Sequence, residues 1–119
     1  MVILLLFALF AFPFSVTVAQ TVSYSKDIFP IVKARCLKCH EKDDENPANF
    51  AMDNVELMLK SGKSKNVIVP GNSAESYLIK KLLPNPPKGA QMPIFSKKKL
   101  SEEEINLFRR WIDQGAKDN

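Results

Sequence analysis

Both cysteines and the only histidine of this 119-residue chain lie in one pentad, Cys36-Leu37-Lys38-Cys39-His40. This cluster constrains the fold because two cysteines allow a single disulfide, and a bridge between Cys36 and Cys39 would close a very small loop that adds little stability. A thioredoxin-like redox pair would need a βαβ unit, which the hydrophobic pattern does not indicate. A structural zinc site needs four nitrogen or sulfur ligands, and the chain offers three. The pentad therefore requires chemistry that uses two neighbouring thiols and one imidazole together.

The spacing Cys-x-x-Cys-His is the attachment signature of c-type haem. Each thiol can add to one vinyl group of the porphyrin and form a thioether, and the adjacent His40 can bind the iron through an imidazole nitrogen. We therefore predict one covalently attached haem c, bound through Cys36, Cys39 and His40. The carbonyls of Pro47 and Pro70 are candidates for orienting the other nitrogen of His40.

Haem iron that is bound by one histidine either takes a sixth ligand or keeps an open site. The soft candidates after residue 19 are Met52, Met58 and Met92. Met58 lies between two leucines of a predicted helix, where packing is the expected role, and Met52 immediately precedes that helix. Met92 lies in the irregular segment 84–99, which can cross the face of a porphyrin, and Pro93 restricts the backbone there. We favour Met92 as the axial ligand, with Met52 and Met58 as alternatives; His/Met ligation closes the iron and raises its potential.

The N-terminal segment differs in composition from the rest of the chain. Residues 1–19 contain no charged side chain, and 16 of these 19 residues are hydrophobic. We predict a signal peptide at 1–19 that is cleaved after Ala19. The prediction rests on the apolar run, the break at Pro13 and the small residues before the cleavage site, Thr17-Val18-Ala19. An uncleaved membrane anchor is the alternative. Residues 20–119 are then one exported domain, which we place in the periplasm, or facing the periplasm if the anchor is retained.

Four short helical segments can be read in the exported part. The first runs from about Ser25 to Cys36, and the second from a cap at Asp53 to Lys60. The third runs from a cap at Ser73 to Leu83. The fourth begins with a capping box of Ser101 and Glu104 and continues to Gly115. Strand-like alternation is confined to Val67-Ile68-Val69, so the pattern predicts an all-α domain.

Several stretches in the same order resemble the small monohaem cytochrome c domains called planctomycete-type, a branch of the cytochrome c superfamily. They cover most of the exported part and read Tyr24-Ser25-Lys26-Asp27-Ile28-Phe29-Pro30-Ile31 before the pentad, Ile68-Val69-Pro70-Gly71-Asn72, Ser76-Tyr77-Leu78, Met92-Pro93, Leu100-Ser101-Glu102-Glu103-Glu104-Ile105 and Trp111-Ile112-Asp113-Gln114-Gly115-Ala116.

This resemblance implies a cytochrome c fold, with about four short helices around one covalently attached haem and the N-terminal and C-terminal helices crossing near a haem edge. It also supports His40 and Met92 as the axial ligands. Two positions depart from the pattern of the family: Glu41 stands where a glycine is common, and Ile94 stands where a second proline is common. Both concern loop geometry rather than the proposed ligands.

The expected function is electron transfer by iron that cycles between Fe(III) and Fe(II), without transformation of a substrate. One alternative is a haem-based sensor or a peroxidase-like enzyme, which needs an open or labile sixth site. A peroxidase is disfavoured because no second histidine remains for distal acid–base chemistry. The other alternative is a haem module that docks in a larger redox complex.

The net charge of +4 comes from lysines, several of which lie close to Met92 in the sequence. A positive ring around an exposed haem edge would steer the protein toward acidic redox partners. A solvated lysine-rich surface is the alternative interpretation. Nucleic-acid binding is not expected in an exported chain without a basic–aromatic motif, and membrane contact is expected only if residues 1–19 are retained. The lysines concerned are Lys80, Lys81, Lys88, Lys97, Lys98 and Lys99.

Overall fold

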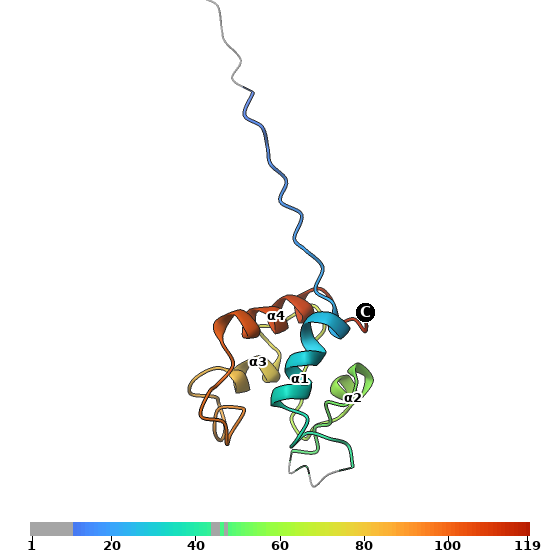
Figure 1. Cartoon of the computed structure of the whole chain (residues 1–119), viewed down its shortest axis with the longest axis vertical. Helices are drawn as coiled ribbons and strands as arrows, with labels where there is room; N and C mark the ends of the chain where they lie inside the picture. The colour runs from blue at the N-terminus through green and yellow to red at the C-terminus, as the bar shows by residue number, and fades with distance from the viewer. Residues whose placement is uncertain (1–10, 44–45, 47) are drawn as a thin grey trace, which may run out of the picture.

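The computed structural model describes residues 11–43, 46 and 48–119. In chain order these contain a π-helical turn η1 (Tyr24–Ile28) and the helices α1 (Phe29–Arg35), α2 (Val55–Lys60), α3 (Tyr77–Leu82) and α4 (Glu102–Asp113). The described residues form no strand, so the predicted all-α class is confirmed. Residues 11–20 are exposed and lead away from the helices as an extended segment (Figure 1). Residues 1–10 of the predicted signal segment lie outside the described part, and no helix among the described residues is long and apolar enough to cross a bilayer.

The first helical segment begins one residue earlier than the sequence predicts and has two parts. Ser23 caps it by accepting a hydrogen bond from the backbone N–H of Lys26. The N–H of Phe29 donates to the carbonyl of Tyr24, which gives the wide π-type turn that precedes α1. Pro30 follows at the start of α1, directly after the π-type turn, a position that tolerates the missing N–H of proline better than a helix interior does. The helix thus continues through a proline and ends just before Cys36.

The starts of α2 and α3 differ from the predicted caps. Asn54, not Asp53, caps α2 by accepting from the N–H of Leu57, whereas Asp53 accepts from the N–H of Lys42. Helix α3 begins after Ser76 rather than after Ser73, because the N–H and hydroxyl of Ser73 both donate to the carboxylate of Asp113 on α4. Asp53 and Ser73, which local sequence rules place at the helix starts, therefore form tertiary hydrogen bonds instead of capping the helices.

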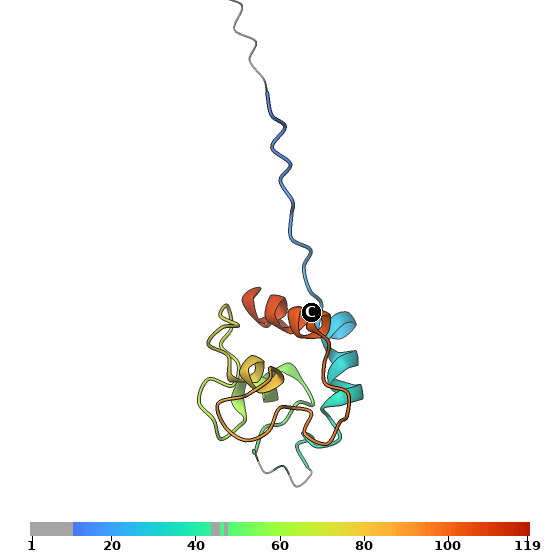
Figure 2. The same ribbon diagram turned by 90° about the vertical axis from the view of Figure 1, so that its left-hand side faces the viewer.

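Helix α4 agrees with its predicted start and packs across η1. The Ser101 side chain accepts from the N–H of Glu104, and the Glu104 carboxylate accepts from the N–H of Ser101, so the capping box is present. The rings of Tyr24 and Trp111 pack with their centroids 5.5 Å apart. The side view shows α4 lying across the upper end of the first helical segment (Figure 2).

One hydrophobic core joins all the helices. Its most deeply buried large side chains come from η1, α1, α2 and α4: Ile28, Val32, Met58, Phe108, Trp111 and Ile112. Helix α3 adds Leu78, Ile79 and Leu82 to the same core. Packing in this core therefore holds the C-terminal end of α1 in a fixed position relative to α3. These two elements flank the site described below.

Candidate functional site

A cavity of about 330 Å³ lies between the end of α1 and helix α3. Its walls include both cysteines and the histidine of the pentad, and also Met92. Most of the remaining lining is apolar and includes four residues of the hydrophobic core, which are Phe50, Met52, Leu78 and Leu82. The predicted site residues, far apart in the sequence, thus meet at one cavity that continues the core.

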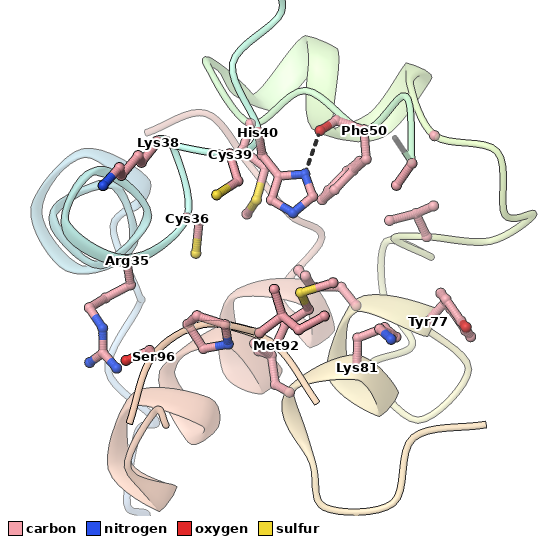
Figure 3. A pocket seen from close by; sticks show the side chains of 18 of the residues that line it. Arg35, Cys36, Lys38, Cys39, His40, Phe50, Tyr77, Lys81, Met92 and Ser96 are labelled. Carbon is pink, nitrogen blue, oxygen red and sulfur yellow. Dashed lines mark hydrogen bonds between the residues drawn. The ribbon is translucent and has the colours of Figure 1, made fainter. Parts of the chain in front are cut away.

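The pentad forms tight turns directly after α1. The N–H groups of Cys36 and Leu37 both donate to the carbonyl of Val32, and the N–H groups of Cys39 and His40 both donate to the carbonyl of Cys36. These turns bring all three chemically active side chains of the pentad to one side of the cavity (Figure 3). Both cysteines are free thiols rather than a disulfide.

Burial raises the pKa of the Cys36 thiol to about 11. The Arg35 guanidinium opposes this rise, but it is the smaller effect. The free thiol is therefore protonated at neutral pH, whereas a reactive redox cysteine is a thiolate. This property disfavours a thioredoxin-like redox pair.

The imidazole of His40 is oriented by the main chain of the segment that follows it. Its Nδ1 lies 2.9 Å from the carbonyl oxygen of Phe50, to which it donates, so Nε2 keeps its lone pair (Figure 3). The Phe50 ring also packs edge-on against the imidazole, with centroids 5.7 Å apart. The acceptor is therefore Phe50 rather than the candidate Pro70; the other candidate, Pro47, lies outside the described residues.

Met92 lies on the wall of the cavity opposite His40 (Figure 3). Its backbone N–H donates to the carbonyl of Lys81 at 2.8 Å. This hydrogen bond connects residues 88–94, which we call the Met92 segment, to α3. Met52 also lines the cavity, but its N–H donates to the carbonyl of His40 at 2.7 Å. Met52 therefore lies on the same wall of the cavity as His40. Met58 is fully buried in the core, where the Tyr24 hydroxyl lies 3.9 Å from its sulfur, and it does not line the cavity.

The sequence predicted neither the hydrogen bond between Phe50 and His40 nor the hydrogen bonds that two lysines donate to the backbone. No motif marks Phe50, because its hydrogen bond to His40 uses a carbonyl that every residue possesses. The side chain of Asn46 donates to the same carbonyl. Among the lysines predicted to face partners, Lys81 and Lys99 donate to backbone carbonyls of the Met92 segment instead. Such contacts can be seen only in the folded chain, because no sequence pattern indicates which carbonyl a lysine ammonium group will bind.

Comparison with known proteins agrees with this arrangement. The family model described as Planctomycete cytochrome C matches residues 36–93, from the first cysteine of the pentad to the proline after Met92. No curated protein and no solved structure gives a significant match. The matched region begins and ends at the two walls of the cavity, and it includes Phe50, α2 and α3. Residues 36–93 therefore match a planctomycete-type cytochrome c domain, and the helices of the described residues are consistent with an all-α, cytochrome c-like fold.

Proposed function

We propose that this protein is an exported electron carrier with one haem c, attached through Cys36 and Cys39 and ligated by His40 and Met92. One observation carries the proposal: the imidazole of His40 and the side chain of Met92 face each other across an apolar cavity that both cysteines line. The family match supports haem binding and electron transfer as the general function.

The residues of the cavity fit such a group. Two free thiols are available for thioether bonds, and His40 uses its Nδ1 for the Phe50 carbonyl, which leaves Nε2 available to a metal among the described residues. Phe50, Met52, Leu78 and Leu82 supply apolar surface of the kind that a porphyrin would require. Haem, when bound, supplies an iron that changes its charge by one electron. A thioether ligand favours the reduced state and leaves no open position for a substrate, which suits a carrier rather than an enzyme.

Spectroelectrochemistry on protein matured with covalent haem tests this proposal. We expect a six-coordinate spectrum with the weak far-red Met–iron band in the ferric state, a reversible one-electron midpoint potential, and no change with CO at moderate concentration. Haem that is released by acidified organic solvent would contradict covalent attachment. A five-coordinate high-spin spectrum would instead support a sensor with an open site.

We further propose that acidic redox proteins dock beside the Met92 segment. Three of the lysines predicted for this role are exposed there, namely Lys88, Lys97 and Lys98. Lys80 forms an ion pair with Glu75, with 3.9 Å between Nζ and Oε2, so we limit the proposed docking surface to the other three lysines. The rate of electron exchange with an acidic partner should fall with rising salt, and Lys97→Glu should slow it. A rate that is independent of salt would argue for a solvated surface only.

Export remains part of the proposal because residues 1–19 have the composition of a signal peptide. Mass spectrometry of the mature protein tests it. A mature chain that begins at Gln20 supports cleavage, and a chain that retains residues 1–19 supports the anchor.

A further inference from the structure

The segment between α3 and α4 has no regular structure at residues 88–94, yet its backbone is held at many points. Five of its carbonyls, those of Lys88, Ala90, Gln91, Pro93 and Ile94, lie within hydrogen-bonding distance of two lysine ammonium groups. The carbonyl of Met92 is not among them. The segment therefore presents backbone oxygens to the lysines and the Met92 side chain to the cavity.

Lys81 holds the first half of this segment from the last turn of α3. Its Nζ donates to the carbonyls of Lys88 and Ala90, both at 2.7 Å. Its own carbonyl accepts from the N–H of Met92 at 2.8 Å, so one residue contacts the segment with both its side chain and its main chain. Gln91 adds a side-chain hydrogen bond to the carbonyl of Leu82 at 2.8 Å. The backbone before Met92 is thus fixed to a helix that is part of the core.

Lys99 holds the second half from the side of α4. Its Nζ donates to the carbonyl of Pro93 and lies 3.3 Å from the carbonyl of Gln91 and 3.5 Å from that of Ile94. An ammonium group has three donors, and here three carbonyls on either side of Met92 converge on it. Leu100, the next residue, is buried in the core and anchors the lysine at its base.

From this arrangement we infer that Lys81 and Lys99 are positioning residues that clamp the Met92 segment and hold the thioether opposite His40. The inference rests on the proposed axial role of Met92 and assigns two of the lysines near it to the support of its backbone rather than to a partner. Hydrogen bonds from charged donors are stronger than those from neutral donors, and irregular backbone has no ladder of its own to replace them. Loss of either ammonium group therefore frees the segment and weakens the hold on Met92.

The test measures how easily imidazole displaces Met92 from ferric haem, with loss of the far-red band as the signal. Lys81→Met and Lys99→Met keep most of the aliphatic stem and remove the donors. Each should lower the imidazole concentration needed by about tenfold, which corresponds to about 1.4 kcal/mol. Lys81→Arg, which keeps charge and donors, should restore most of the difference. Lys80→Met removes the same charge one residue away and is the matched control, with an expected change of less than about twofold.

Amide hydrogen exchange supplies a second measurement that does not depend on ligation. In Lys81→Met the N–H of Met92, which donates to the carbonyl of residue 81, should exchange faster, whereas the N–H groups of α4 should be unchanged. If the wild-type protein shows no far-red band, the axial role of Met92 fails, and exchange alone decides whether the clamp exists. Unchanged exchange at Met92 in Lys81→Met overturns the inference, and so does faster exchange without any change in imidazole affinity where the far-red band is present.

Discussion

A main-chain atom, rather than a second functional side chain, orients His40. Because Nδ1 donates to the carbonyl of Phe50, Nε2 is the nitrogen that can bind a metal. A hydrogen bond of this kind also fixes the plane of the ring and makes the ligand more basic. The main chain therefore leaves Nε2 available for the ligand role that we propose for His40.

Replacing Met92 should remove the sixth ligand, whereas replacing Met52 should not. We expect Met92→Ala to lose the far-red Met–iron band and to lower the midpoint potential by at least about 59 mV, a tenfold change in the one-electron equilibrium. Met52→Ala removes a side chain that is 2% exposed, so it should destabilise the protein by about 2–5 kcal/mol and keep the band. Absorption spectra and redox titrations of the two variants distinguish these outcomes. The opposite pattern would make Met52 the ligand.

At the scale of secondary structure, the packing of η1 against α4 sets where the pentad begins. Tyr24 lies at this contact, packs against Trp111 and Phe29, and is 6% exposed. Burial raises the pKa of its hydroxyl to about 12, with smaller contributions from Asp118 and Asp53. The folded state therefore favours the neutral phenol.

This raised pKa predicts a loss of stability in alkaline solution. The contribution of Tyr24 is fully present below pH 10, the ordinary pKa of tyrosine, and is lost as the pH rises toward and through about 12. Urea unfolding at a series of pH values, compared between wild type and Tyr24→Phe, isolates this contribution because the lysines titrate in both proteins. The free energy of unfolding of the wild type should fall more steeply over this interval. Parallel curves for the two proteins would show that the hydroxyl is not buried in the way described.

At the scale of the whole molecule, the cavity interrupts the hydrophobic core. Four core residues, Phe50, Met52, Leu78 and Leu82, have side chains that also face the cavity. Only 38 of the 100 residues from 20 to 119 are hydrophobic, which is a small supply for a domain of this size. A bound porphyrin would supply apolar contacts that the polypeptide lacks.

We therefore expect the protein without haem to be loosely packed. In a Cys36→Ser/Cys39→Ser variant purified free of haem, the near-UV circular dichroism should be weak and should show no cooperative thermal transition. Far-UV spectra should retain much of the helical signal. The single variant Cys39→Ser, which keeps one thiol and both proposed axial ligands, is the control. A sharp near-UV transition in the haem-free double variant would show that the polypeptide core suffices alone.

The amino-acid sequence by itself predicted the haem chemistry and determined the class of the fold. The pentad, the capping box of Ser101 and Glu104 and the helical spacing of Ile105, Phe108, Trp111 and Ile112 are local patterns, and local patterns follow from covalent spacing and backbone geometry.

Only the tertiary structure decided on which wall of the cavity Met52 and Met92 lie and which carbonyl orients His40. It also decided which lysines donate hydrogen bonds to the backbone of the Met92 segment. It also moved the start of α3 away from Ser73, whose polar groups contact Asp113 forty positions later. The physical reason is the same in each case. These features depend on pairs of groups that are distant in the chain, and a backbone carbonyl or an ammonium group is available everywhere until folding selects its partner.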